Sequence, residues 1–430
     1  MTSEVVIANK SAIVMAADSA LTIGKNNKIF TTSNKIFMLK KPHPIGIMIF
    51  GNSELISTPW EIIIKVYREE QRDEPWPNVE EYVKKFKKWI IKQTRFFPES
   101  MQRENIGIEC YIVIEEEILE KIDYEMKKIE EINEKTDINI EEKLYEITDK
   151  IIDELNEDYK KSDFLQNFND NNVQEFIKLY NDDLDEAISE FKNRITLNDK
   201  QKYKIKEITI NNFLKKDFET YLTSGIIIAG YGNDDLFPSI YEFHIRGALD
   251  NKLIIEDIDE RKISHEKPIF IDSYAQDDMI QAFIGGVHPY YDIWIKDYIM
   301  KLIDETHEKT EKLISPILKN GDYKKIKSKL EKLKENQIEQ FTEKHKDTIK
   351  SLFTPIISLL DSLPKEELAI MAESLINIQS FKKRVSFDSE TVGGPIDVAI
   401  ITKGEGFIWI KRKHYFKPEL NPDYMDKIKK

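Results

Sequence analysis

The residue whose chemistry stands out is Thr2, which directly follows the initiator Met1. Methionine aminopeptidases remove Met1 when the next side chain is small, and threonine is small enough. Removal leaves a hydroxyl and a free α-amine on one residue. Because an α-amine has a pKa of about 8, it can accept the hydroxyl proton near neutral pH. The sequence therefore predicts that Thr2 becomes an N-terminal nucleophile that serves as its own general base.

A charged pair is expected beside this threonine. Asp18 ends an apolar stretch, residues 12–17, sixteen positions after Thr2. A carboxylate at a buried strand end needs a cation or hydrogen-bond donors, and Lys35 at the start of the next apolar strand is the natural partner. An ammonium group beside the Thr2 amine would keep that amine deprotonated and assist proton transfer. Without Thr2, we would interpret the two residues as a turn aspartate and a strand-edge lysine.

A third candidate is Gly51, at the junction between an apolar strand and an expected helix. A glycine at such a junction lets the backbone approach a ligand, and its N–H can stabilise an oxyanion. Asn52 and Ser53 add polar groups at the same place. The alternative is an ordinary turn glycine before a capped helix.

Short apolar runs separated by turn residues predict the strands that must position these groups. Strand pairs followed by helices are typical of a sheet covered on one face. The expected strands are residues 5–8, 12–17, 35–39, 45–50, 110–114, 224–230, 239–245, 397–401 and 406–410, with a further pair within 253–271. The expected helices beside them are residues 53–68, 79–90 and 277–284, and one that begins at Ser362-Leu363-Pro364 with Ser362 as its cap.

Two charged stretches lack this strand pattern. From residue 115 to about 215, isoleucine and leucine recur at helical spacing among Glu and Lys, and glycine is absent. This predicts an inserted helical hairpin or small bundle. A coiled-coil partner surface is the alternative, although the apolar spacing is not sustained as strict heptads. The expected organisation is a core in three parts (1–114, 218–300 and 352–415), two helical insertions (115–217 and 301–351) and a polar C-terminal tail (416–430).

Together these features resemble the proteasome β-subunit family of N-terminal-nucleophile hydrolases, which includes the bacterial HslV type. The interval between Thr2 and Asp18 equals the interval in that family. The resemblance covers residues 1–114, 218–300 and 352–412. Its motifs are Thr2, Ala16-Ala17-Asp18-Ser19, Lys35-Ile36-Phe37, Gly51 and the stretch from Asp388 through Gly393-Gly394 to Val398.

The resemblance implies an α+β fold, a four-layer α-β-β-α sandwich with the active site at one open end of its two sheets. It also implies that Thr2 is nucleophile and base, that Asp18 and Lys35 are the charge pair, and that Gly51 is the oxyanion donor. The serine that the family places before its third helix corresponds to Ser273, and its Asp and Ser before the Gly-Gly pair correspond to Asp388 and Thr391.

The chain departs from the family because ring subunits are shorter and lack the two charged insertions. The insertions would block stacked rings, replace an ATPase partner or form a new binding surface. The resemblance implies a homo-oligomer, with an ATPase or another regulatory protein as a further partner.

Composition narrows the function classes. The 430 residues carry a net charge of −14, which repels phosphate backbones and argues against nucleic acid as a general partner. Cys110 is the only cysteine, so no intrachain disulfide is possible and a cytoplasmic location is expected. No apolar run approaches the roughly 18 residues of a membrane span. We also expect no metal and no cofactor, because the seven histidines do not cluster and no phosphate-binding loop occurs.

The expected function is therefore a proteasome-like threonine-type hydrolase that cleaves peptide or amide bonds in a polypeptide or amide substrate. Two alternatives remain open. One is a catalytically silent assembly or binding subunit with the same fold, although such a subunit has no need of the set Thr2, Asp18, Lys35 and Gly51. The other is a non-proteolytic amidase in which the insertions shape a small-molecule pocket.

Overall fold

The protein is a mixed α+β molecule. Its structure is a computed structural model that describes residues 3–23, 28–132, 140–317, 320–386, 392–414 and 416–423. Contacts between its elements divide the chain into two compact units. Unit 1 comprises residues 1–36, 236–238 and 262–430, and unit 2 comprises residues 37–235 and 239–261. Each unit combines one large sheet with its own helices. The expected alternation of core and insertions stays a prediction.

Unit 1 is built on a five-stranded sheet with the order β12-β1-β2-β13-β14. Neighbouring strands are antiparallel, and Ala17 lies opposite Glu4 on one side and Asp397 on the other. The two central strands β1 and β2 are buried along their whole length, as their apolar sequences predict. The strands are Ser3–Asn9 (β1), Ile13–Ala17 (β2), Ile269–Ala275 (β12), Asp397–Thr402 (β13) and Gly406–Lys411 (β14).

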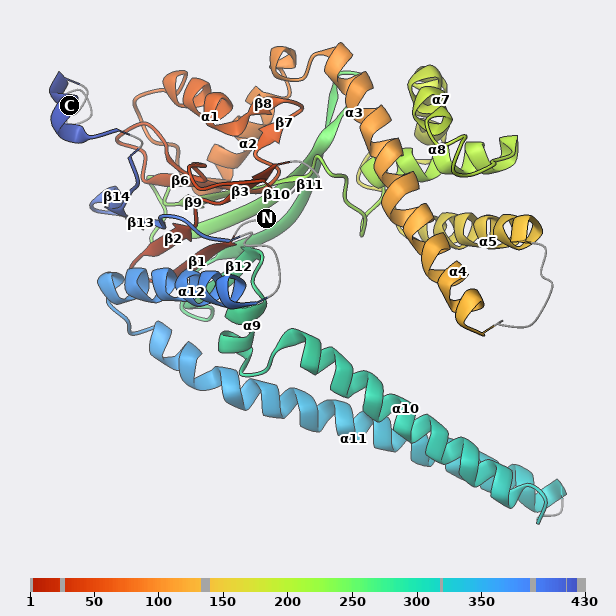
Figure 1. The fold of residues 1–430 in the computed structure, drawn as a ribbon. Helices are drawn as coiled ribbons and strands as arrows, with labels where there is room; N and C mark the ends of the chain where they lie inside the picture. Colours follow the sequence, from red (N-terminus) through yellow and green to blue (C-terminus); the bar gives the residue numbers. More distant parts are fainter. Residues whose placement is uncertain are drawn as a thin grey trace. The chain divides into compact units, whose positions relative to one another are not determined.

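Helices α9 (Asp278–Gly285) and α12 (Lys365–Val385) cover one face of this sheet (Figure 1). Val5, Val14 and Ala16 pack in the same apolar cluster as the buried side chains of these helices. Because successive side chains of a strand point to opposite faces, Glu4 and its neighbours Ala17 and Asp397 lie on the other face. The register of the sheet therefore places charged side chains away from α12.

Helix α12 begins later than the sequence predicts. Its N-cap is Pro364, which makes no side-chain cap bond, so the expected Ser362 cap is wrong. A proline fits at a helix start because the first helical N–H groups have no intrahelical partner. Two acidic residues, Glu366 and Glu367, lie in the first turn of α12.

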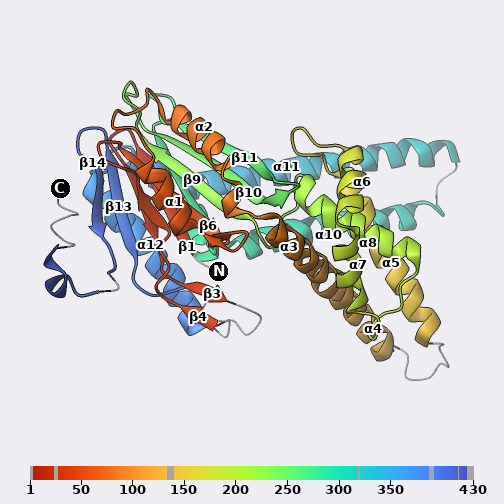
Figure 2. The same ribbon diagram turned by 90° about the horizontal axis from the view of Figure 1, so that it is seen from above.

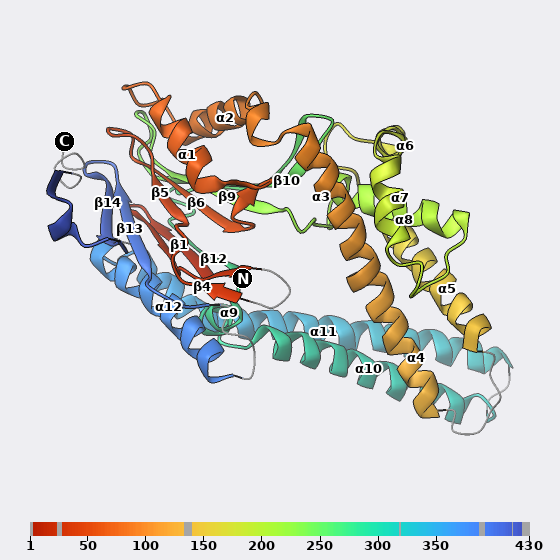
Figure 3. The same cartoon turned by 45° about the horizontal axis from the view of Figure 1, so that its top comes forward.

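The charged helices of unit 1 form a hairpin in which α10 (Pro289–Ile314) and α11 (Asn320–Leu360) lie side by side (Figures 1 and 3). Both helices extend beyond the expected insertion 301–351. Helix α10 begins directly after His288, whose side chain accepts a hydrogen bond from the Tyr290 N–H. Two smaller elements complete the unit. They are the hairpin β3 (Leu21–Ile23) and β4 (Lys28–Phe30), visible in Figure 2, and the 3-10 turn η3 (Pro418–Leu420).

Unit 2 contains a second five-stranded sheet with the order β11-β10-β9-β6-β5. Trp60, Phe86 and Phe243 join its helices α1 and α2 to the sheet in one apolar cluster. Helix α1 begins at Trp60 and not at Ser53, because a short hairpin of β7 and β8 precedes it. The elements are Ile36–Met38 (β5), Ile45–Gly51 (β6), Glu54–Leu55 (β7), Thr58–Pro59 (β8), Trp60–Glu69 (α1), Val79–Ile90 (α2), Ser224–Gly230 (β9), Ser239–Leu249 (β10) and Lys252–Lys262 (β11).

A set of helices occupies the rest of unit 2, in which α3 lies beside α7 (Figure 3). Their buried side chains pack in one apolar cluster. Within the described residues, no helix is both long and apolar enough to cross a membrane. The elements are Thr94–Phe96 (η1), Glu99–Ile112 (α3), the π-helical turn Val113–Leu119 (η2), Glu120–Ile132 (α4), Ile140–Lys161 (α5), Asp170–Leu179 (α6), Asn181–Ser189 (α7) and Asp199–Leu214 (α8).

The strand predicted at residues 110–114 is wrong, because this segment belongs to α3 and η2. A short apolar run cannot distinguish a buried strand from a buried helix segment by periodicity alone. Cys110, Val113 and Ile114 are buried together with Ile106 in the helical cluster, at helical spacing. The helices accordingly begin at Glu99, before the boundary expected at residue 115.

A buried carboxylate lies inside this helical bundle. Glu109 accepts hydrogen bonds from Asn212 Nδ2 at 2.7 Å and from the Tyr221 N–H at 3.1 Å. Burial raises the pKa of Glu109 to about 7, although these two hydrogen bonds oppose the shift. The folded state therefore binds the proton more tightly than the unfolded chain does. The stability that proton binding by Glu109 contributes is fully present below the unfolded pKa and is lost as the pH rises through about 7.

We predict that Glu109→Gln removes this loss, because glutamine does not ionise. The melting temperature of the variant minus that of wild type should increase by a few degrees from pH 5 to pH 8. Thermal unfolding at the two pH values measures this difference. Glu104→Gln on the exposed side of α3 is the matched control and should follow wild type. A constant difference between Glu109→Gln and wild type at both pH values would contradict the prediction.

Candidate active site

The carboxylate of Asp18 joins three separate segments of unit 1. Its Oδ1 accepts a hydrogen bond from the Ser3 N–H at 3.2 Å and contacts Lys35 Nζ. Its Oδ2 accepts from the Gly393 N–H at 2.7 Å. Asp18 is almost fully buried, so these donors replace the water that an ionised carboxylate needs. The start of the chain, the lysine and the Gly-Gly segment therefore meet at one side chain.

Backbone pairing holds Asp18 in this position. The Asp18 N–H donates to the Ser3 carbonyl at 3.1 Å, just beyond the paired residues of β1 and β2. The next residue, Ser19, donates its N–H to the Gly393 carbonyl at 3.2 Å and its hydroxyl to the Pro395 carbonyl. The segment after β2 is thus fixed on one side to the first strand and on the other side to the Gly-Gly segment.

The position of Gly394, beside the Asp18 carboxylate, requires a glycine. Its φ is +83°, a conformation that side chains with a Cβ rarely adopt. A Cβ at this position would lie 2.7 Å from the Cβ of Thr31. Both the backbone conformation and the close approach of Thr31 therefore exclude a larger residue.

Lys35 is held by a second carboxylate that the sequence analysis missed. Its Nζ lies 3.3 Å from Oε1 of Glu4, in addition to its contact with Asp18. The lysine side chain and both carboxylates are buried. A glutamate next to the apolar run Val5–Ala8 was the available signal, because a charged residue in a buried strand requires a partner.

A second buried ion pair lies in the same sheet. Asp397 contacts Lys413 Nζ through Oδ2 and accepts a hydrogen bond from the Lys413 N–H at 2.8 Å through Oδ1. Burial lowers the pKa of Lys413, while the hydrogen bond to Asp397 opposes the shift and the charge of Lys35 adds to it. The segment after β14 therefore lies close enough to Lys35 for the two charges to interact.

Of the predicted site residues, Asp18 and Lys35 are in contact, as the sequence analysis expects. Thr2, Asp388 and Thr391 lie outside the described residues, although the N–H of Ser3, the direct neighbour of Thr2, binds Asp18.

The serine predicted before the third helix has other partners. Ser273 pairs with Val5 in the register of β1 and β12, and its hydroxyl donates to Asp277 Oδ2 at 2.9 Å. Gln281 Nε2 in turn donates to the Ser273 hydroxyl at 3.0 Å. The role of Ser273 at the active site stays a prediction.

Gly51 is the last residue of β6 in unit 2. It is exposed and its φ is +74°, and a Cβ here would lie 2.8 Å from the Thr223 carbonyl oxygen. These properties explain the glycine by backbone conformation. Its role as an oxyanion donor stays a prediction.

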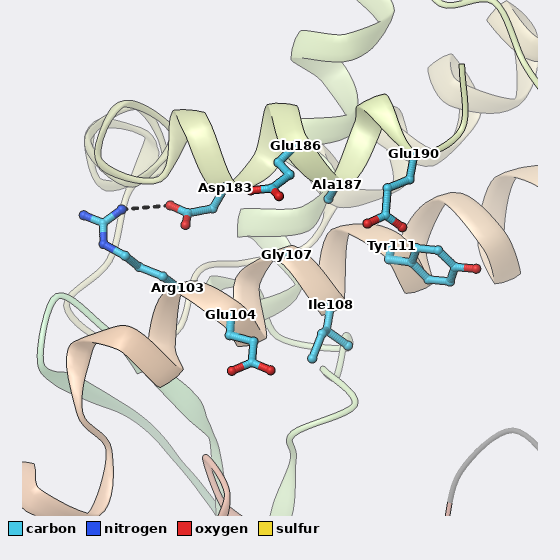
Figure 4. A pocket seen from close by; sticks show the side chains of 9 residues that line it. All are labelled: Arg103, Glu104, Gly107, Ile108, Tyr111, Asp183, Glu186, Ala187 and Glu190. Atoms are coloured by element: carbon cyan, nitrogen blue, oxygen red, sulfur yellow. Dashed lines mark hydrogen bonds and ion pairs between the residues drawn. The ribbon is translucent and has the colours of Figure 1, made fainter. Parts of the chain in front are cut away.

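A cavity of about 350 Å³ lies within unit 2 between α3 and α7 (Figure 4). Arg103 at one end forms an ion pair with Asp183 at 2.8 Å. The other lining residues are Glu104, Gly107, Ile108, Tyr111, Glu186, Ala187 and Glu190. In the described part of this lining no nucleophile meets a base, so the cavity does not compete with Asp18 as a candidate for covalent chemistry. Within the described residues, no group of three or more His, Cys, Asp and Glu side chains could hold a metal ion.

Comparisons with known proteins give a loose link in fold. No model of a known protein family matches the chain, and no curated protein matches it. Among solved structures, Anbu (ancestral beta-subunit) from Yersinia bercovieri is 10% identical, with 99% of this chain and 94% of that chain covered and a TM-score of 0.26. A Gly-1 mutant of Anbu from Hyphomicrobium sp. strain MC1 is also 10% identical, with 100% and 95% covered and a TM-score of 0.28.

The expected membership in the proteasome β-subunit and HslV family is therefore wrong. The similar solved structures are Anbu proteins, a proteasome-like but distinct family. The motifs that suggested membership are short, and they do not extend to a match with any family model. Since the structural likeness is loose, the function of this chain has to be argued from its own site.

We predict that Asp18→Asn lowers the free energy of unfolding of unit 1 by about 3–5 kcal/mol, because it leaves Lys35 buried with one partner fewer. Denaturant unfolding measures this loss. The matched control is Asp361→Asn, which removes the half-exposed ion pair with Lys10 at 3.0 Å and should cost less than about 1 kcal/mol. Equal losses in the two variants would contradict the role assigned to Asp18.

We also predict that Gly394→Ala destabilises the protein by about 1–3 kcal/mol, because alanine is strained at positive φ and approaches Thr31 too closely. Gly404→Ala is the control, since no atom lies within 4 Å of its added Cβ. Its effect should stay within about 0.5 kcal/mol. Chemical denaturation of both variants provides the comparison, and a Gly394→Ala protein as stable as the control would refute the steric argument.

Proposed function

We propose that the protein is a threonine-type hydrolase that cleaves peptide or amide bonds, with Thr2 as N-terminal nucleophile after removal of Met1. The observation that carries this proposal is the convergence of three segments on Asp18. The Ser3 N–H, Lys35 Nζ and the Gly393 N–H all bind its buried carboxylate. Because consecutive Cα atoms are about 3.8 Å apart, Thr2 is tied to this group by its bond to Ser3.

The reaction follows from the groups that Thr2 brings. Its hydroxyl oxygen attacks the carbonyl carbon of the substrate while its α-amine takes the hydroxyl proton. The amine then gives this proton to the leaving nitrogen, the C–N bond breaks, and an ester between Thr2 and the acyl group remains. Water, deprotonated by the same amine, attacks the ester and releases the acid and the free Thr2 hydroxyl.

Lys35 has an electrostatic role in this scheme. Its ammonium group is fixed by Asp18 and Glu4, so it remains in place while charge develops at Thr2. Preorganised charges of this kind stabilise a transition state without a cost of reorganisation. The Gly51 N–H is proposed as the donor to the oxyanion, which its exposed position at positive φ allows.

The four-layer sandwich and the homo-oligomer are part of the same proposal. Each unit supplies a five-stranded sheet with helices packed on it, which are the components that such a sandwich requires. One similar solved structure is named as an ancestral beta-subunit, and an assembly of several copies is proposed for this chain.

We predict that the purified, untagged protein lacks Met1 and that Thr2→Ala abolishes hydrolysis of peptide substrates. Thr2→Ser is the matched control, because it keeps a hydroxyl and an α-amine and should retain measurable activity. Intact mass and peptide hydrolysis measured on the three proteins test this. Both substituted side chains are small, so Met1 removal should be the same in all three.

Retained Met1, or full activity of Thr2→Ala, would refute the proposed mechanism. A folded protein without Met1 that hydrolyses neither peptides nor small amides would favour the silent subunit. Hydrolysis of small amides and never of peptides would favour a non-proteolytic amidase. The assays need an unmodified N-terminus, because any N-terminal extension converts the Thr2 amine into a peptide N–H.

A further inference from the structure

Glu4 anchors Lys35 in the proposed site, and its own charge has a further consequence for the reaction. Its side chain is fully buried, and Oε1 lies 3.3 Å from Lys35 Nζ. Lys35 is therefore held from two directions, by Asp18 at the end of β2 and by Glu4 within β1. Glu4 follows Thr2 by two residues, so their Cα atoms are at most about 7 Å apart in any conformation.

The groups around Glu4 come from all the neighbouring strands of the sheet. Tyr274 lies opposite Glu4 on β12, and Ala17 lies opposite on β2, with Asp397 beyond it on β13. Lys413 follows β14 and pairs with Asp397. Among the described residues, ion pairs near the N-terminal end of β1 connect the carboxylates of Glu4, Asp18 and Asp397 with the ammonium groups of Lys35 and Lys413.

An ionised Glu4 adds one negative charge to the two ion pairs Asp18–Lys35 and Asp397–Lys413. Without Glu4, the two carboxylates Asp18 and Asp397 would balance the two lysines. With Glu4, a positive charge placed close to the cluster is stabilised. The α-amine of Thr2, which can gain or lose a positive charge, is two residues away from Glu4 along the chain.

We propose that Glu4 is a positioning residue that holds Lys35 from the β1 side and, through its charge, sets the pH range in which the Thr2 amine serves as general base. This inference rests on the proposed function, since it assigns a regulator to the same amine. An amine acts as base only in its unprotonated form. Lys35 favours that form by repulsion, and Glu4 offsets Lys35, so the working range moves to higher pH.

The test compares wild type, Glu4→Gln and the control Asp361→Asn without an N-terminal tag. Asp361 also pairs with a lysine in unit 1, but that lysine follows the far end of β1. The pH dependence of acetylation of the Thr2 amine by trace acetic anhydride is measured by mass spectrometry. The pH dependence of peptide hydrolysis is measured in parallel. The first readout needs a free Thr2 amine but no catalysis.

In Glu4→Gln we expect the midpoint of acetylation to move to lower pH, so that the amine reacts about tenfold faster than in wild type below that midpoint. The acid limb of hydrolysis should move by the same amount, while the plateau falls because Lys35 loses one of its two anchors. Asp361→Asn should follow wild type in both measurements. A merely structural role of Glu4 would lower the plateau without moving the limb.

An unchanged acetylation midpoint in a folded Glu4→Gln protein would overturn the inference and leave the proposed hydrolase intact. A shifted midpoint in a protein that never hydrolyses peptides or amides would support the charge effect and refute the proposed function. If Glu4→Gln does not fold, the same two pH dependences are measured on Glu4→Met, which is similar in volume and uncharged. Failure of both variants to fold would make Glu4 a residue of the folding core and would contradict the inference.

Discussion

A carboxylate buried at the end of a strand constrains unit 1 more than any other group, because its charge requires donors that the core cannot otherwise supply. Asp18 obtains them from the Ser3 N–H, from Lys35 and from the Gly393 N–H. These donors come from the beginning of the chain, from the next segment and from a position hundreds of residues later. Removing one donor leaves the others around an incompletely compensated charge, so the segments are fixed together.

The five-stranded sheet of unit 1 brings further charged side chains together. Ala17 lies between Glu4 and Asp397 in the register of three strands, so two acidic side chains share one face. Each acid is matched by a lysine from outside the sheet, Lys35 for Glu4 and Lys413 for Asp397. The other face carries the apolar side chains that pack on α12. One sheet therefore separates an apolar core from a charge cluster, and the cluster lies at the end where the chain begins.

Sequence reasoning predicted the parts of this arrangement that depend on local pattern. The apolar runs gave the central strands, and a carboxylate that ends a buried strand required a cation, which identified Asp18 and Lys35. Glu4 and the pair Asp397–Lys413 were missed because their neighbours are set by the register between distant strands, which one sequence does not display. Residues 110–114 were assigned to a strand because a short apolar run has no distinct period. The family assignment failed because its motifs were short, whereas the chemistry suggested by Asp18 did not depend on that assignment.

In the proposed reaction the Thr2 hydroxyl becomes covalently attached to the acyl group, which can be tested at a single atom. The direct measurement is peptide mapping by tandem mass spectrometry after the untagged protein has reacted with a β-lactone, which acylates nucleophilic hydroxyls. We expect one adduct, on the N-terminal peptide that begins with Thr2, and its loss when Asp18 is replaced by Asn. An adduct confined to another residue, or an N-terminal peptide that still carries Met1 and remains unmodified, would contradict the proposed reaction.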